Sequence, residues 1–137
     1  MTIERIGEAC RTARKARGMP QWEAAELAGY VQAAISLLER GKKQITLDTL
    51  FRIMDIVGLK LSVGGRTVGS PEEVYGMIRH AQVRKKWNDR KVSEASGVSM
   101  ATIRNWNDRK IGNAYAECVL TVAEGLKLKV DFIQEEL

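Results

Sequence analysis

Apolar residues in the first half of the chain recur at helical spacing. Ile6, Cys10 and Ala13 lie on one face of a helix that ends at the break around Gly18. The same spacing predicts three more helices, over residues 21–28, 32–40 and 47–57. Glycines follow each of them, as is typical of helix C-termini. The first half is therefore predicted to be helical.

The second half shows the same alternation of helices and stops. Its first helix begins with the capping box Ser70-Pro71-Glu72-Glu73, which has proline at N1 and glutamate at N3. Asn88 and Ser99 are predicted N-caps of two shorter helices. The predicted helices span residues 71–86, 89–96, 100–108 and 114–124.

The two halves resemble each other in sequence. At an offset of 68, Gly29 aligns with Gly97 and Ile35 with Ile103. At an offset of 67, Gly58-Leu59-Lys60-Leu61-Ser62-Val63 matches Gly125-Leu126-Lys127-Leu128-Lys129-Val130 with one mismatch. We interpret this as a tandem duplication, with a first domain at residues 1–64, a linker at 65–69 and a second domain at 70–137.

Each copy ends in a segment that alternates apolar and polar residues. The alternation over residues 59–63 and 126–132 predicts one short strand per copy. A lone strand leaves its backbone amides unpaired, so the two tails are expected to pair with each other. Pairing within one chain gives a pseudo-dimer, whereas pairing between chains gives a true homodimer.

Each half contains a helix, a short turn with glycine near its start, and a second helix with an inward isoleucine, which is the helix-turn-helix pattern. The matching positions are Gln21, Ala25, Gly29, Ile35 and Glu39-Arg40-Gly41-Lys42, then Gly97-Val98-Ser99, Ala101, Thr102 and Ile103. In these positions the chain resembles the Xre/Cro-repressor family, and its tails resemble those of HipB-like antitoxins, which pair strands between subunits. The resemblance implies an all-α fold of two tandem lambda-repressor-like domains of four or five helices, each followed by a short β-strand.

The resemblance also implies a contact that holds the recognition helix. In the family, an arginine of the first helix pairs with a glutamate at the end of the recognition helix, which here are Arg14 and Glu39. Moving both by 68 gives Gln82 and Asn107, which we expect to bond to each other as neutral amides. The alternative is that all four are unrelated surface residues.

Helix-turn-helix proteins read bases with the start of the second helix and hold phosphates with the flanking segments. The base-reading candidates are Gln32, Ala33, Ser36 and Leu37, and Ser99, Met100, Ala101, Arg104 and Asn105. The phosphate candidates are Gln21, Arg40, Lys42 and Lys43, and Arg90, Lys91, Arg109 and Lys110. The alternative for Arg104 and Arg109 is a solvated basic face.

Both copies depart from the family pattern. Val31 stands where a Ser or Thr cap is usual, and the helix after it is mostly apolar. Asp89 stands where the first copy has the phosphate-binding Gln21, and a carboxylate there would repel DNA. Because Arg104 and Asn105 can hydrogen-bond to base edges, we favour the second copy as the stronger base reader.

Composition excludes several classes of function. The 137 residues carry a net charge of +5, which permits a nucleic-acid partner without demonstrating one. Two cysteines, Cys10 and Cys118, and the single His80 supply neither a disulfide framework nor a zinc ligand set. No nucleophile–base pair, glycine-rich phosphate loop or paired carboxylates are visible, so we expect no enzyme activity, cofactor or metal.

The chain shows no signal peptide and no apolar run of membrane-spanning length. We therefore expect a cytoplasmic protein, bacterial or phage-encoded, that is nucleoid-associated when bound to DNA.

The leading hypothesis is a sequence-specific regulator of transcription that binds double-stranded DNA. We expect a repressor of phage or mobile-element type, acting as a single-chain pseudo-dimer on an asymmetric operator. The alternative is an antitoxin-type interaction module that binds a toxin and autoregulates its operon, which the tails and the unmatched Trp22 favour. A third hypothesis is that a degenerate first copy only supports the second.

Overall fold

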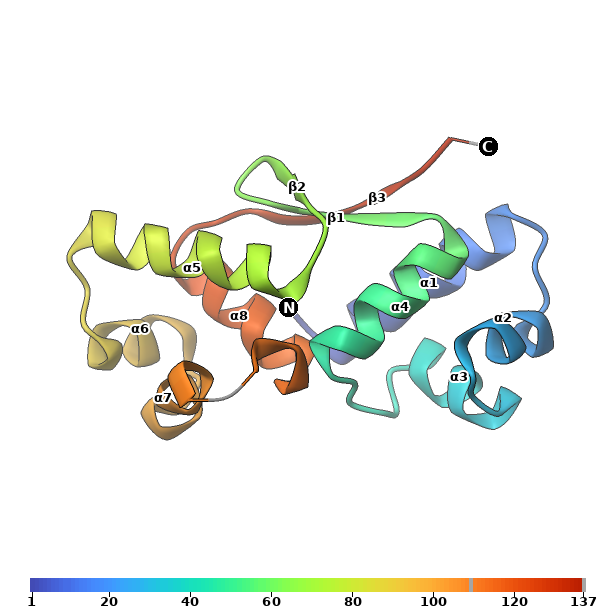
Figure 1. Ribbon diagram of the computed structural model, residues 1–137, viewed down its shortest axis with the longest axis horizontal. Coiled ribbons are helices and arrows are strands. Elements are labelled where there is room, and N and C mark those ends of the chain that lie inside the picture. The colour runs from blue at the N-terminus through green and yellow to red at the C-terminus, as the bar shows by residue number, and fades with distance from the viewer. Residues whose placement is uncertain (109, 137) are drawn as a thin grey trace.

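The order of four helices followed by a strand occurs twice along the chain (Figure 1). The computed structural model describes residues 1–108 and 110–136. The first half contains α1 (Ile3–Ala16), α2 (Gln21–Ala28), α3 (Gln32–Glu39), α4 (Leu47–Val57), β1 (Leu59–Val63) and β2 (Arg66–Val68). The second contains α5 (Pro71–Lys85), α6 (Asp89–Ser96), α7 (Met100–Asp108), the 3-10 turn η1 (Ile111–Asn113), α8 (Ala116–Gly125) and β3 (Val130–Gln134). The expected all-α fold class, with short strands after the helices, is confirmed.

Capping residues set the beginnings of these helices. The side chains of Thr2, Thr46 and Ser70 each accept a hydrogen bond from a backbone N–H three residues on. Asn88 does the same for α6, as the sequence predicted. Gly29 ends α2 in the left-handed conformation, with φ of 76°, which favours glycine. Local sequence therefore fixes most helix boundaries.

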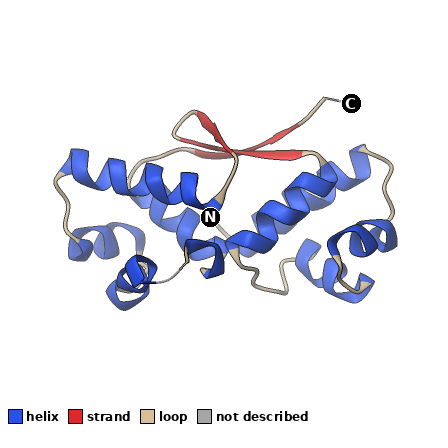
Figure 2. Cartoon of the chain, viewed as in Figure 1, coloured by secondary structure: helices blue, strands red, loops and turns tan. Residues whose placement is uncertain are grey.

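The strands form one antiparallel sheet in the order β2-β1-β3. β1 lies at its centre and pairs with β3 from the end of the chain, with Leu61 opposite Phe132 and Val63 opposite Val130. The tails of the two halves thus pair within one chain. Figure 2 shows the three strands together on one side of the molecule, with helices on the other.

The position of the second tail strand differs from the prediction. The strand expected over residues 126–132 runs instead from Val130 to Gln134. Gly125 is the last residue of α8 and packs closely on α6, where a Cβ would lie 2.9 Å from the Cα of Ser96. Lys127 takes the left-handed conformation, with φ of 66°, and delays the strand. The expected linker also holds β2, which forms a hairpin with β1.

The halves share a core and a second backbone contact. Leu50 and Met54 of α4 and Leu120 of α8 belong to one cluster of buried side chains. The segments that lead into α4 and α8 also pair, because the N–H of Leu47 donates to the carbonyl oxygen of Ala114 (2.8 Å). The amino group of Met1 contacts Glu124 of α8. Packing thus continues from one half into the other.

Candidate nucleic-acid interface

The α2–α3 pair presents one face of α3 to solvent. Ile35 and Leu38 are buried and fix α3 against the core. Val31 precedes α3 and makes no side-chain cap hydrogen bond. Of the base-reading candidates in this half, Gln32, Ala33 and Leu37 are exposed and Ser36 is half-buried. The exposed face is thus poor in hydrogen-bonding groups, as the sequence indicated.

A buried ion pair holds the end of α3. The Nε and Nη2 of Arg14 donate to Oε2 and Oε1 of Glu39 at 2.6 and 2.9 Å. Arg14 also donates to the carbonyl oxygen of Met19 (2.7 Å), and Gln21 donates to Glu39 (3.1 Å). Both charged side chains are buried, so each depends on the other to compensate its charge. Gln21, a phosphate candidate, thus takes part in this network.

Gly7 allows α3 to approach α1 closely. A Cβ at Gly7 would lie 2.3 Å from the carbonyl oxygen of Leu38 and 2.9 Å from that of Glu39. Side chains larger than hydrogen would therefore push the end of α3 away from α1. The short separation in turn brings Glu39 within reach of Arg14.

The α6–α7 pair is built in the same order with different contacts. Ser99 caps α7 by accepting from the N–H of Thr102 (3.2 Å), and Ile103 and Trp106 are buried beneath it. The base-reading candidates Ala101, Arg104 and Asn105 are exposed together with Ser99, and Met100 is half-buried. This face carries a guanidinium and an amide where α3 carries apolar groups.

The two amides expected to bond each other in the second half bond elsewhere. Gln82 donates to Oδ1 of Asp89 (3.0 Å), and Asn107 accepts a hydrogen bond from the hydroxyl of Tyr75. Tyr75, on α5, occupies the position of Gly7, 68 residues on, and its hydroxyl reaches Asn107 on α7. Burial raises the pKa of the Tyr75 hydroxyl, with a further increase from Asp89 against a decrease from Arg79. Sequence reasoning missed Tyr75, although the alignment with Gly7 was available.

The carboxylate of Asp89 interacts with two side chains of the protein itself. Its Oδ1 accepts from Gln82, and its Oδ2 lies 3.8 Å from Nε of Arg104. The carboxylate that the sequence marked as a repulsive group thus pairs with the strongest base-reading candidate. Arg104 remains mostly exposed, so the pair orients its side chain without burying it.

The phosphate candidates differ in how they are held. Arg40, Lys42, Lys43, Arg90, Lys91 and Lys110 are exposed. Nε of Arg40 donates to the carbonyl oxygen of Ser36 (3.3 Å), and Nζ of Lys110 lies 4.0 Å from Oδ2 of Asp48. Arg109 lies outside the described residues.

A basic cluster surrounds a half-buried tryptophan at the start of α6. Nζ of Lys91 and of Lys85 lie 5.5 and 5.2 Å from the centre of the Trp87 ring. Lys85 was not among the candidates, although the run Arg84-Lys85-Lys86 before Trp87 could have indicated it. This cluster adds positive charge beside the α6–α7 pair.

The two helix pairs lie at opposite ends of the molecule and on the same side. Figure 1 shows α2 and α3 at one end, α6 and α7 at the other, and both pairs away from the sheet. The β1–β3 pairing and the contact before α4 and α8 hold this arrangement.

Comparison with known proteins finds a family match in the first half. Residues 11–63 match the helix-turn-helix family model. This segment is a helix-turn-helix domain. Two relatives are the HTH-type transcriptional regulator PuuR of Escherichia coli (strain K12) and that of Shigella flexneri, each 30% identical over 92 residues. The match covers 67% of this chain and 46% of each relative, so the chain spans about half the length of the curated relatives it matches.

The helix-turn-helix domain contains α2, α3, α4 and β1 entirely, with the C-terminal part of α1. No solved structure matches the chain. In residues 1–108 and 110–136, no helix is long and apolar enough to cross a membrane. The same residues hold no group of three or more His, Cys, Asp or Glu side chains that could bind a metal ion.

Proposed function

We propose that the chain is a sequence-specific regulator of transcription that binds double-stranded DNA and acts as a repressor. The observation that carries this proposal is the helix-turn-helix domain at residues 11–63, whose α3 is fixed by the buried Arg14–Glu39 pair. The names of the two relatives, both HTH-type transcriptional regulators, support it. In such a domain the second helix enters the major groove.

The second helix pair extends the proposal to a single-chain pseudo-dimer. The α6–α7 pair has the same element order and lies on the same side of the molecule as α2–α3 (Figure 2). Two such pairs held about 34–36 Å apart would meet successive major grooves on one side of the duplex. The pairing of β1 with β3 supports a fixed spacing within one chain.

The different faces of α3 and α7 support an asymmetric operator. Arg104 can donate two hydrogen bonds to guanine and Asn105 can serve adenine, whereas Leu37 and Ala33 offer apolar contact such as a thymine methyl. Gln32 is the strongest polar candidate on α3, and its amide lies 3.5 Å from that of Gln21. The two halves would therefore read different half-sites.

Selection of bound fragments from random DNA tests the proposal. A bipartite motif without symmetry supports a pseudo-dimer, whereas a palindrome supports a dimer of chains. Recovery of no motif contradicts sequence-specific binding. The affinity for a recovered site should fall about 10³- to 10⁵-fold between about 50 and 200 mM salt if six or more phosphates are contacted. An affinity that does not change with salt contradicts the proposed phosphate contacts.

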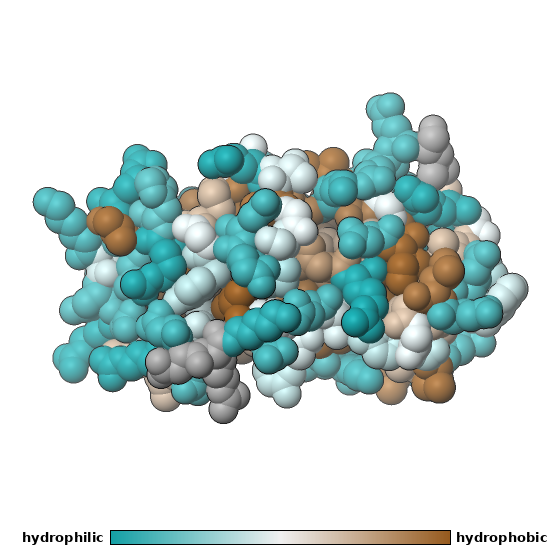
Figure 3. Space-filling view, in the orientation of Figure 1, coloured by the Kyte–Doolittle hydropathy of each residue, from teal (hydrophilic) through white to brown (hydrophobic). Residues whose placement is uncertain are grey.

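Exposed apolar side chains favour a second candidate function, an antitoxin-type module that binds a toxin and autoregulates its operon. Trp22, Leu27 and Val31 are 57%, 61% and 69% exposed, on α2 and the turn after it. Figure 3 shows hydrophobic side chains on the surface at the end of the molecule that holds these elements. Co-purification with the product of a neighbouring gene, lost on Trp22→Ala, would favour this function. Retention by Trp22→Ala would argue against this surface.

A further inference from the structure

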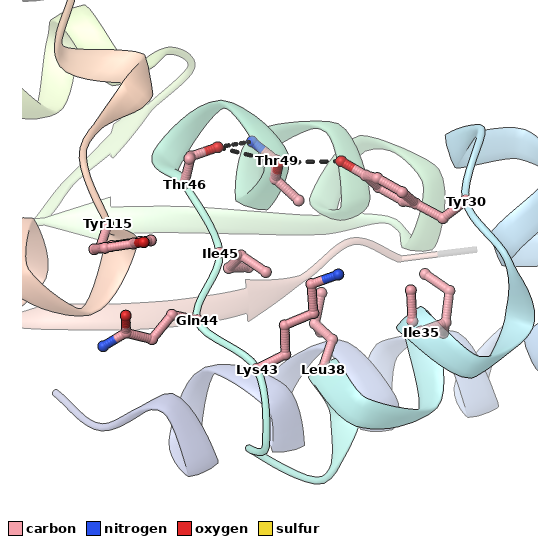
Figure 4. Close-up of a pocket in the computed structure, with 10 residues that line it drawn as sticks. Tyr30, Ile35, Leu38, Lys43, Gln44, Ile45, Thr46, Thr49 and Tyr115 are labelled. Atoms are coloured by element: carbon pink, nitrogen blue, oxygen red, sulfur yellow. Dashed lines mark hydrogen bonds between the residues drawn. The ribbon is translucent and has the colours of Figure 1, made fainter.

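A pocket of about 240 Å³ lies where the two halves meet (Figure 4). Its walls come from three segments: α2–α3, the segment that leads into α4, and the start of α8. The side chains that line it include Tyr30, Ile35, Leu38, Lys43, Ile45 and Tyr115. Tyr115 comes from the second half, whereas the other five belong to the helix-turn-helix domain.

The pocket has aromatic side chains at two sides and aliphatic groups between them. Figure 4 shows Tyr30 and Tyr115 on opposite sides, with Ile45 and Leu38 between them and Ile35 on the side of Tyr30. A pocket of this size is below the range of about 300–1,000 Å³ typical of drug-sized ligands. It therefore fits a small molecule with a single ring.

A second pocket, of about 220 Å³, is lined by residues of the second half and also includes Tyr115. There Trp106 stands in the place of Leu38 and Thr102 in the place of Ala34, each 68 residues on. The bulkier indole and the added hydroxyl give the second pocket a different wall. The apolar ring site is therefore a feature of the first half.

One charged group reaches into the first pocket. Lys43 extends from the segment before α4 into the space between Ile45 and Ile35 (Figure 4). The hydroxyls on the opposite side bond to one another, since Tyr30 Oη and Thr46 Oγ1 each lie 3.1 Å from Thr49 Oγ1. The carboxylate of the nearby Asp48 lies 4.0 Å from Lys110. The ammonium group of Lys43 is thus the group in this pocket that can bind a charged ligand.

We propose that this pocket binds a small aromatic carboxylate, with its ring between Tyr30 and Tyr115 and its carboxylate on the ammonium of Lys43. Charge-assisted contacts of this kind are stronger than neutral ones, and the partly enclosed aromatic site strengthens them further. The ring replaces water in an apolar space, which favours binding through the hydrophobic effect.

Binding at this site opposes DNA binding, a consequence that rests on the proposed function. Ile35 and Leu38 belong to α3, so an occupied pocket fixes α3 relative to Tyr115 of the other half. Lys43 is also a phosphate candidate, and an ammonium engaged by a carboxylate is lost to the DNA backbone. By linkage, DNA weakens ligand binding by the same factor as the ligand weakens DNA binding.

The test uses benzoate, benzyl alcohol and benzylamine as probes of matched size at constant ionic strength. Each is titrated into the full chain while methyl resonances of Ile35, Leu38 and Ile45 are followed by NMR. We expect saturable shifts with benzoate, and an affinity about tenfold above that for benzylamine, from one charge-assisted contact. Lys43→Gln should abolish the preference for benzoate over benzyl alcohol and leave benzyl alcohol binding unchanged. Lys42→Gln is the matched control, since Lys42 is an exposed neighbour outside the pocket lining and should keep the preference.

Three results would overturn the proposal: no saturable shift at these methyls, equal affinity for all three probes, or the same preference in Lys43→Gln as in the parent chain. A second titration measures the affinity for a DNA fragment recovered by selection, with and without benzoate. An unchanged DNA affinity at saturating benzoate overturns the coupling. Benzoate binding by a chain that binds no DNA contradicts the proposed function alone, whereas DNA binding without benzoate binding contradicts the pocket alone.

Discussion

Helices α3 and α7, at matching positions in the two halves, are held in place by different chemistry. In the first half, Gly7 brings α3 against α1, and Arg14 and Glu39 form a buried bidentate ion pair. In the second half, Tyr75 stands in place of the glycine, and its hydroxyl donates to the exposed amide of Asn107. The first contact is a buried ion pair, and the second is an exposed hydrogen bond between two neutral side chains.

The difference shows that one contact network changes as a unit. Four positions differ together between the halves: Gly7 and Tyr75, Arg14 and Gln82, Gln21 and Asp89, and Glu39 and Asn107. Replacing only Glu39 by an amide would leave the guanidinium buried without its counter-charge. In the second half the polar groups instead form two separate contacts, Gln82 with Asp89 and Tyr75 with Asn107.

The largest expected effect comes from breaking the buried pair. Glu39→Ala leaves Arg14 buried without its counter-charge and should lower the free energy of unfolding by about 3–5 kcal/mol. The matched change Asn107→Ala removes one exposed hydrogen bond and should cost about 0.5–1.5 kcal/mol. Urea unfolding of the two variants measures both. Equal costs would show that the two halves do not differ in the way the contacts indicate.

Measurements of DNA binding compare the exposed faces of α3 and α7. Arg104→Ala should weaken binding to a selected site by about 1–3 kcal/mol if Arg104 contacts a guanine, and should relax specificity at that base pair. Gln32→Ala is the matched change on α3, and we expect a smaller loss, because the rest of that face is apolar. Binding assays of both variants on the selected site and on base-substituted copies provide the measurement. A larger loss for Gln32→Ala would reverse our assignment of the stronger reader.

Substitution of two glycines by alanine distinguishes the effect of close helix packing from the effect of helix propensity. Gly7→Ala places a Cβ against the carbonyl oxygen of Leu38 and should destabilise the fold by about 1–3 kcal/mol through overpacking. Gly76 lies in α5, where a Cβ meets nothing within 4 Å. Gly76→Ala should therefore stabilise the fold by about 0.5–1 kcal/mol. Thermal unfolding of the two variants decides, and changes of the same sign would contradict the close packing of α1 and α3.

The last comparison concerns pH and the two cysteines. Burial raises the pKa of the Cys10 thiol from 9.0 to about 12, with a smaller contribution from Glu39. Because the folded state holds this proton more tightly than the unfolded chain, stability falls as the pH rises above 9.0, by roughly 1 kcal/mol per pH unit. Urea unfolding at pH 8 and pH 10 should show this loss in the parent chain. The loss should persist in Cys118→Ala and be smaller in Cys10→Ala.

The helices were predictable because their signals are local. The bounds of α2 and α6 follow from the proline, asparagine and glycine residues beside them, and those of α7 from Ser99. The position of the second strand was not predictable, because Gly125 is required by its approach to Ser96, which lies 29 residues earlier in the chain. The repeated block that begins at Gly58 and at Gly125 therefore adopts two different conformations with nearly the same sequence.

The contacts of the candidate site were predictable where they depend on a single pair of residues. Arg14 and Glu39 were found by position, and they do form the expected ion pair. The partners of Gln82 and Asn107 were not found, because they depend on Tyr75 and Asp89, which occupy positions of different chemistry in the first half. The pocket beside Tyr115 depends on packing between the halves, for which the repeat contains no signal.

The pairing of β1 with β3 has a consequence for how the protein responds to its own abundance. A regulator assembled from two chains loses its paired form on dilution, so its activity depends on the square of its concentration at low levels. Here both strands belong to one polypeptide, and their encounter is intramolecular at every concentration. If both helix pairs bind one DNA site, as proposed, occupancy far below saturation should therefore rise in direct proportion to the number of chains, without a threshold.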